Sequence, residues 1–229
     1  MHIGLLYAMP EERQAFTAQL STYQTRQIAG LNAYVTRIGA HDITLVECGI
    51  GKVNAAIAAT KLIQDKPLDL LISTGVSGGI NLDPESLVLA HSVAYHDVDV
   101  RAFGQYVKGQ LPGMSPYFKA DENTLQIALE CAKKHGYKSY VGMVVSGDQF
   151  LTNSATLKDM MALYEDIYAT DMEAAAVAHV ATLENIPFLM IRSISDRLDA
   201  PSQIADFKIF LDRAAKRAAE IVHALVQSL

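Results

Sequence analysis

Short apolar runs alternate along the chain with longer segments in which small and apolar residues recur at helical spacing. The runs predict buried strands at residues 3–7, 68–73, 86–95, 140–146 and 188–193. The longer segments predict helices over residues 52–64, 172–183 and 203–227, and Asp121 is expected to open a further helix as its N-cap. Strands that alternate with helices are typical of an α/β fold whose largely parallel sheet is covered by helices.

Three further β-like runs follow one another near the start of the chain, at residues 23–27, 32–37 and 43–48. Runs so closely spaced predict antiparallel pairs. We therefore expect a single α/β domain over residues 1–229, with a mixed, twisted central β-sheet flanked by α-helices. Residues 97–119 are rich in glycine and proline and predict a long irregular loop, which in a compact domain is usually a binding loop or a lid.

Composition narrows the classes of protein to which the chain can belong. Half of its 229 residues are apolar and 19% are charged, which excludes a disordered chain and predicts a large buried interior or a buried interface. The formal net charge is −6 and there is no basic run, so a nucleic-acid partner is not expected. With no signal-peptide pattern and no apolar stretch of the roughly 18 residues that a membrane span needs, we expect a soluble, cytoplasmic protein with no membrane partner.

Cysteine usage gives no sign of a metal site or a disulfide framework. Cys48 and Cys131 are the only cysteines, and they are too far apart in sequence to form a metal-ligand motif. Both lie among apolar residues, so we expect buried, inert thiols.

Polar and glycine-rich segments follow the predicted strands, and open α/β sheets bind their ligands outside the carboxyl ends of the strands. Each segment also has an ordinary structural explanation: Glu12 suits the first turn of a helix, Glu173 a helix N-terminus and Asp196 a cap. The glycines among residues 75–79 suit a tight turn that approaches a ligand closely. The segments are residues 9–12, 49–52, 75–79, 146–150, 171–173 and 192–196.

Taken together and in this order, these segments resemble the methylthioadenosine/adenosylhomocysteine nucleosidases of the nucleoside phosphorylase superfamily. The resemblance implies a homodimeric, cytoplasmic hydrolase of methionine and sulfur salvage. Such an enzyme cleaves the N-glycosidic bond of both nucleosides, releases adenine and the thiopentose, and needs no metal and no organic cofactor. The matching stretches cover nearly the whole chain: Ala8-Met9-Pro10-Glu11-Glu12, Gly49-Ile50-Gly51-Lys52-Val53, residues 95–104, 110–113 and 118–121, Ser146-Gly147-Asp148, Met172-Glu173-Ala174 and Ile194-Ser195-Asp196.

The resemblance assigns the chemical roles. N-glycosidic cleavage passes through a ribosyl cation, so Asp196 is implied to protonate N7 of the purine and Glu12 to activate the water. Burial is expected to raise the pKa of Asp196, while the helix dipole is expected to favour the ionised form of Glu12. Glu173 is implied to bind the ribose hydroxyls, and its charge also favours the cation.

A binding shell is implied in the same way. Phe150 matches the ring that stacks on adenine, and Leu151 the position whose backbone reads the adenine edge. Arg192 matches a residue near the catalytic water, Ser195 one that supports the acid, and Met172 one that lies under the ribose. The apolar lining of the sugar and the 5′-thio tail is expected to comprise Met9, Ile50, Val100, Phe103, Pro112 and Phe207.

The chain departs from the family pattern in two places. The family commonly has Ser-Ala where this chain has Val76 and Ser77, followed by Gly78; Ser77 is expected to supply the missing hydroxyl from the next position. The long loop, which carries Phe103 and Pro112, has Gln105 where an aromatic is common, and it is one residue longer. In the family this loop is contributed across the dimer interface.

Three alternatives stay open. A phosphorolytic nucleoside phosphorylase of the same superfamily needs clustered arginines for phosphate, whereas Glu11 and Glu12 would repel the anion. A hydrolase for another 5′-substituted purine nucleoside, such as futalosine or deoxyadenosine, would use the same residues. A catalytically silent nucleoside sensor would keep Phe150 and Glu173 but lose the acid or the base, and both are present.

Overall fold

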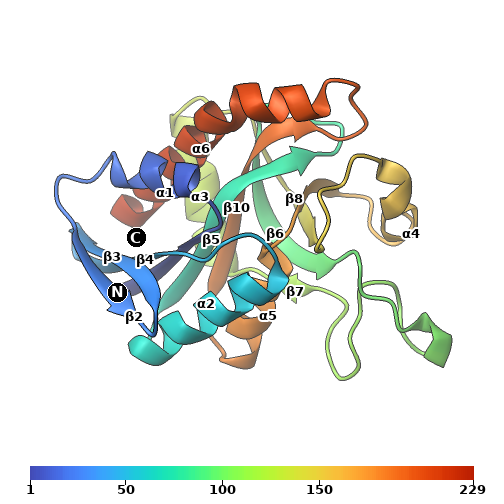
Figure 1. Cartoon of the computed structure of the whole chain (residues 1–229), viewed down its shortest axis with the longest axis horizontal. Coiled ribbons are helices and arrows are strands. Elements are labelled where there is room, and N and C mark those ends of the chain that lie inside the picture. Colours follow the sequence, from blue (N-terminus) through green and yellow to red (C-terminus); the bar gives the residue numbers. More distant parts are fainter.

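Ten strands form one mixed sheet at the centre of the computed structural model, which describes residues 1–229 (Figure 1). The strands are β1 (His2–Tyr7), β2 (Gln24–Ile28), β3 (Leu31–Ile38), β4 (His41–Glu47), β5 (Leu70–Gly79), β6 (Leu87–Tyr95), β7 (Phe118–Lys119), β8 (Ser139–Ser146), β9 (Ile167–Asp171) and β10 (Phe188–Arg197). The helices are α1 (Pro10–Thr17), α2 (Lys52–Asp65), α3 (Glu122–Lys134), α4 (Lys158–Met161), α5 (Ala174–Leu183) and α6 (Gln203–Ser228), with 3-10 turns η1 (Arg101–Phe103) and η2 (Ser154–Leu157). The expectation of an α/β fold with a mixed sheet is confirmed.

Part of the sheet closes on itself. β5 pairs with β10 along one edge and with β9 at Gly78 and Gly79 on the other, and β6 and β8 connect β10 to β9. These five strands form a closed ring, from which β1, β4, β3 and β2 extend. β1 follows the same edge of β5 only as far as Ser73, so residues 74–77 of β5 have no strand neighbour on that side. The fold therefore leaves an opening between the end of β1 and β9.

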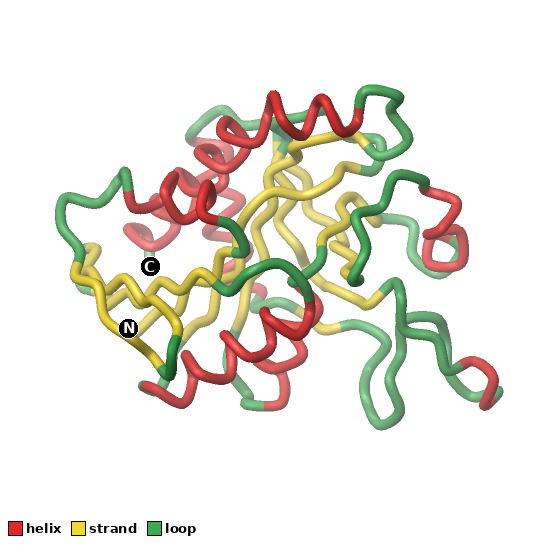
Figure 2. The backbone as a smooth tube through the Cα atoms, viewed as in Figure 1, coloured by secondary structure: helices red, strands yellow, loops and turns green.

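Helices cover both faces of the sheet. α1, α3 and α6 lie on one face and α2 and α5 on the other (Figures 1 and 2). Alanines at residues 55, 58 and 59 of α2 and at residues 174–176 and 178 of α5 lie buried in one core cluster, and such small side chains allow close packing. The amphipathic helix α6 buries Ile221, Val222 and Leu225 in a second cluster on the opposite face.

Two strands run further than the sequence pattern predicted. The prediction of a tight turn at residues 75–79 is wrong, because β5 continues to Gly79 and pairs with β10 over this stretch. Likewise, the strand expected to end at residue 193 continues to Arg197, with a bulge between Ile194 and Asp196. Such a bulge re-aims side chains. Ser195 and Asp196 thus lie within β10 and not in a loop after it.

Other predictions are confirmed or refined. The three early β runs form β2, β3 and β4, and the Asp121 side chain caps α3 by accepting the Thr124 N–H at 2.8 Å. Residues 97–119 are irregular apart from η1 and β7, and they project from the body of the fold (Figure 2). Cys131 is buried as expected, whereas Cys48 is half-buried, and burial raises the pKa of its thiol. None of the helices combines the length and the apolarity required to cross a membrane.

Candidate active site

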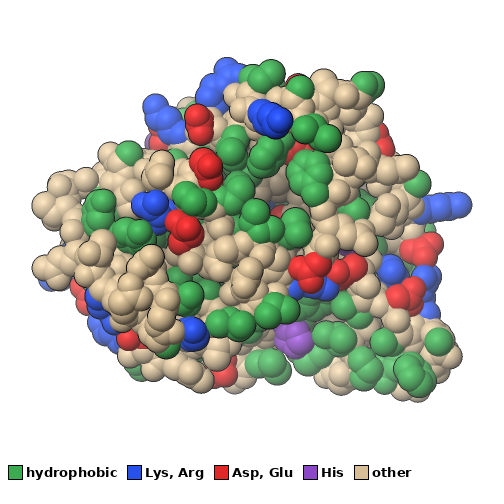
Figure 3. Space-filling model, in the orientation of Figure 1, with side chains coloured by type: hydrophobic (Ala, Val, Ile, Leu, Met, Phe, Trp, Pro, Cys, Tyr) green, Lys and Arg blue, Asp and Glu red, His purple; other side chains and the backbone are tan.

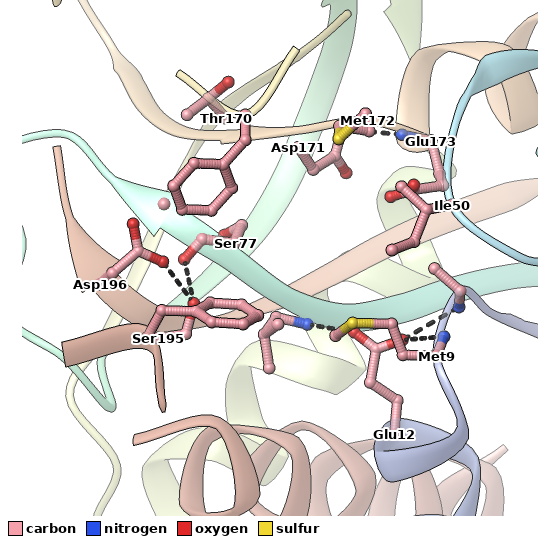
Figure 4. Close-up of a pocket in the computed structure, with 15 residues that line it drawn as sticks. Met9, Glu12, Ile50, Ser77, Thr170, Asp171, Met172, Glu173, Ser195 and Asp196 are labelled. Atoms are coloured by element: carbon pink, nitrogen blue, oxygen red, sulfur yellow. Dashed lines mark hydrogen bonds between the residues drawn. The ribbon is translucent and has the colours of Figure 1, made fainter. Parts of the chain in front are cut away.

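A pocket of about 100 Å³ lies at the opening in the sheet, where the carboxyl ends of β1, β5, β9 and β10 meet (Figure 4). It contains most of the residues proposed from the sequence, together with four that were not assigned there: Ala8, Val76, Thr170 and Asp171. The proposed residues that line it are Met9, Glu12, Ile50, Ser77, Gly78, Phe150, Met172, Glu173, Ser195, Asp196 and Phe207.

Glu12 is fixed by three backbone N–H groups. It is the third residue of α1, whose first residue is Pro10, and one of its oxygens accepts the N–H of Ala8 and of Met9, each at 3.0 Å. Its other oxygen accepts the N–H of Val76 at 2.8 Å, a donor that the missing strand neighbour leaves available. The residue is 2% exposed. Burial raises the pKa of Glu12, and the three N–H groups and the Arg192 charge only oppose this rise, so the expectation that the helix dipole would dominate is wrong.

Gly75 explains how the strand comes so close to this carboxylate. A Cβ atom at Gly75 would lie 2.2 Å from Oε1 of Glu12, well inside van der Waals contact. The glycine-rich sequence of β5 therefore serves a close approach, as the sequence predicted, but to a side chain of the protein itself.

We expect Gly75→Ala to displace the Glu12 carboxylate and to lower the free energy of unfolding by about 2–3 kcal/mol, the value of roughly one hydrogen bond to a charged group. Urea unfolding measures this change. The matched control is the same substitution in a Glu12→Ala background, where the clash is absent and the loss should be much smaller. Equal losses in the two backgrounds would show that Gly75 matters for another reason.

Glu173 and Asp171 form an acidic cluster around the start of α5. Glu173 is the N-cap of α5, and its Oε1 accepts the Gly51 N–H at 2.8 Å. Asp171 accepts the N–H of Glu173 at 3.3 Å and of Ala174 at 3.2 Å, so it binds the helix N-terminus. Burial, followed by repulsion from Asp171, raises the pKa of Glu173 to about 7.

Arg192 lies behind the pocket instead of lining it. Its Nε donates to Asp171 at 2.8 Å, one terminal nitrogen donates to the Ser73 hydroxyl at 3.0 Å and the other to the Ile191 carbonyl at 3.1 Å. The side chain is fully enclosed and does not line the pocket, and the expectation that it lies near the catalytic water stays a prediction. It supplies a buried positive charge that offsets the neighbouring carboxylates.

Asp196 lies on the opposite side of the pocket from Glu12, with Ser77 between them (Figure 4). The Ser195 hydroxyl donates to its Oδ1 at 2.6 Å, and Nε2 of Gln203 donates to its Oδ2 at 2.8 Å. Asp196 is 1% exposed, and burial raises its pKa against the effect of these two donors, as expected from the sequence. Gln203 was not found by sequence reasoning, because a polar residue at the start of a helix carries no signal of its own.

The apolar wall is formed by aromatic and aliphatic side chains. The rings of Phe150 and Phe207 meet edge to face, with centroids 5.8 Å apart. Met9, Ile50 and Met172 complete this wall. Leu151 is buried in a small adjoining cavity, next to Gln203 and Asp196.

Three of the proposed lining residues are not brought to the pocket of their own chain. Val100, Phe103 and Pro112 lie on the long projecting loop, and Phe103 is 75% exposed. Their distance from this pocket follows from the direction of the loop, which leads away from the ends of β5 and β10 (Figure 1). A role for them in a partner's pocket stays a prediction.

Comparison with known proteins places this chain in a family. Residues 2–227 match the family model of the phosphorylase superfamily. The chain is 31% identical to a 5′-methylthioadenosine/S-adenosylhomocysteine nucleosidase from Neisseria meningitidis, solved with methylthio-immucillin-A, over 100% of this chain and 99% of that one, with a TM-score of 0.93. It is 31% identical to an S-adenosylhomocysteine nucleosidase from Streptococcus pyogenes, solved with 5-methylthiotubericidin, over 100% and 97% of the two chains, with a TM-score of 0.93.

A third similar structure holds the base alone. It is the nucleosidase of the same name from Colwellia psychrerythraea in complex with adenine, 29% identical over 100% of this chain and 96% of that one, with a TM-score of 0.93. A match over nearly the whole chain at 29–31% identity shows that the protein belongs to the 5′-methylthioadenosine/S-adenosylhomocysteine nucleosidases, N-glycosyl hydrolases of the phosphorylase superfamily.

Proposed function

We propose that this protein hydrolyses the N-glycosidic bond of 5′-methylthioadenosine and S-adenosylhomocysteine, releasing adenine and the thiopentose. The observation that carries the proposal is the placement of two buried carboxyls, Glu12 and Asp196, on separate sides of one pocket. Hydrolysis of a glycosidic bond needs two such groups, one to protonate the leaving group and one to deprotonate the water. The relatives named above were solved with analogues of this nucleoside or with adenine, which supports the same substrate class.

In this mechanism Asp196 donates its proton to N7 of the purine while the bond between C1′ and N9 breaks. The electron pair of that bond moves to the base. Burial keeps Asp196 protonated at a pH where an ordinary aspartate is ionised. The oxygen of a water molecule then bonds to C1′, and Glu12 accepts its proton. Glu173 accepts hydrogen bonds from the ribose hydroxyls, and its negative charge stabilises the cationic sugar.

Ser77 is the residue that we assign to the hydroxyl otherwise supplied at position 76. Its Oγ is buried at the pocket and has no hydrogen-bond partner within the protein. A buried hydroxyl without a partner is costly, so a water or a substrate hydroxyl at this place would satisfy it. This supports the expectation that Ser77 compensates for Val76.

The charge of the pocket favours water over phosphate as the nucleophile. Four carboxyl groups line the pocket, from Glu12, Asp171, Glu173 and Asp196, and no lysine or arginine does. The nearest cation, Arg192, is already bonded to Asp171. A phosphate dianion would find no free cation there and would be repelled by the carboxyl groups that are ionised, so phosphorolysis is disfavoured.

Chromatography of the products from 5′-methylthioadenosine and S-adenosylhomocysteine tests the proposal. Free adenine is expected from both nucleosides. Adenine or base release from futalosine or deoxyadenosine alone would instead favour the hydrolase of another purine nucleoside. Tight binding with no release would favour the silent sensor.

We also propose that the protein acts as a homodimer in the cytoplasm, in methionine and sulfur salvage. Large apolar side chains are exposed on α2 and on the projecting loop, including Val53, Ile57, Phe103 and Val107, and Figure 3 shows hydrophobic side chains gathered on that loop. Exposed apolar groups of this kind are typical of a protein interface. Light scattering at the assay concentration is expected to give the mass of a dimer; a fully active monomer would contradict the assignment of Phe103 and Pro112 to the partner's pocket.

A further inference from the structure

We propose that the Gln203 side-chain amide takes the place of the amino group of adenine at the base-binding groups and is displaced when the base binds. This inference rests on the proposed function, because it takes Asp196 and the Leu151 backbone as the groups that recognise the base. It concerns the first residue of α6, which none of the roles above includes.

The geometry of the amide supports a competition with the base. Nε2 of Gln203 donates to the Leu151 carbonyl at 2.8 Å and to Oδ2 of Asp196 at 2.8 Å. Only the NH₂ end can donate to a carbonyl, so the orientation of the amide is fixed. The exocyclic amine of adenine is likewise an NH₂ group with two hydrogens, and it lies beside N7. A base that places N7 at Asp196 directs its amine to the position that Gln203 Nε2 occupies.

The space around the amide excludes simultaneous occupancy. The cavity that Gln203 shares with Phe150, Leu151 and Asp196 has a volume of about 30 Å³. That is room for a water molecule or two and not for a purine ring. Gln203 itself is 4% exposed, so its side chain fills much of this site.

The oxygen of the Gln203 amide is unsatisfied in this conformation of the side chain. Oε1 of Gln203 is buried and has no hydrogen-bond partner. A buried carbonyl without a partner is unfavourable, and rotation of the side chain outward would let water satisfy it. A surface hollow of about 500 Å³, lined by residues that include Thr152, Ile204 and Lys208, also borders Gln203 and offers the side chain a place to turn into.

The test is calorimetric titration with adenine of the wild type and of Gln203→Met, which keeps the length of the side chain and removes its donor and acceptor. We expect the variant to bind adenine about tenfold more tightly, because adenine no longer has to displace a hydrogen-bonded amide. A tenfold change corresponds to the net free energy of about one neutral hydrogen bond. The matched control is Gln227→Met, the same change on an exposed turn of α6, which should leave the affinity unchanged. Weaker binding by Gln203→Met would mean that the amide contacts the base directly, and unchanged binding would mean that it does not compete; either overturns the proposal.

A second measurement needs no variant. In a crystal structure of the wild type with adenine, Gln203 Nε2 should have left hydrogen-bond distance of the Leu151 carbonyl, and retention of that bond beside bound adenine would overturn the proposal. Failure of the proposed function is measured separately, because it would appear as the absence of adenine release when the wild type is given the two nucleosides without phosphate.

Discussion

Replacement of Asp196 by Asn is expected to reduce the rate of adenine release from 5′-methylthioadenosine by at least about 100-fold, the low end for loss of a general acid. The amide keeps the size of the side chain and can still donate a hydrogen bond to N7. It has no proton to transfer, so adenine would have to leave as an anion. Steady-state assays of the purified variant measure the loss.

A leaving group that needs no proton provides the control. A nucleoside analogue with an activated leaving group should lose far less activity in Asp196→Asn than the adenine nucleosides do. In the wild type, turnover of adenine nucleosides should fall as pH rises through the elevated pKa of Asp196, because the carboxyl then loses the proton that it must donate. If both substrates lost activity equally, Asp196 would hold the site together without acting as the acid.

Replacement of Glu12 by Gln is expected to remove turnover by about 10²- to 10⁴-fold, because an amide cannot accept the proton of the attacking water. Adenine binding should be largely retained, since Glu12 lies on the far side of the pocket from Asp196 (Figure 4). Turnover and the dissociation constant of adenine are measured on the same preparation.

The hydrogen bonds of Glu12 also affect the stability of the Glu12→Gln variant. Both carboxylate oxygens of Glu12 accept backbone N–H groups, and a glutamine has one oxygen for the three donors from Ala8, Met9 and Val76. Some loss of stability is therefore expected, and the melting temperature has to be recorded beside the kinetics. Near-wild-type turnover in a folded Glu12→Gln variant would contradict the assignment of the base.

Local patterns were enough to predict the layers of the fold. The apolar runs that form β1, β5, β6, β8 and β10 and the amphipathic helix α6 carry their periodicity in the chain itself. β9 was not predicted, because Ile167–Asp171 is short and follows two acidic residues, Glu165 and Asp166. Its pairing with both β5 and β8 stabilises it as a strand, and that pairing is set by the tertiary fold.

The motifs predicted most of the residues that line the pocket and the raised pKa of Asp196, but not the environment of Glu12. The sequence places Glu12 at a helix start, and only the fold shows that β5 packs against its carboxylate and buries it. The same holds for Arg192, whose partner Asp171 comes from another strand, and for Gln203, which is far from Leu151 in the chain. Interactions of this kind depend on where separate elements meet, and a single sequence does not reveal that.

The identity of the nucleophile tests the central claim most directly. The measurement is the rate of adenine release from 5′-methylthioadenosine in buffers with and without phosphate, with mass spectrometry of the sugar product. The account predicts equal rates and an unphosphorylated thiopentose in both buffers, because the pocket is lined by carboxyl groups and by no lysine or arginine that could bind phosphate. A rate that vanishes without phosphate, together with a sugar 1-phosphate as product, would contradict it.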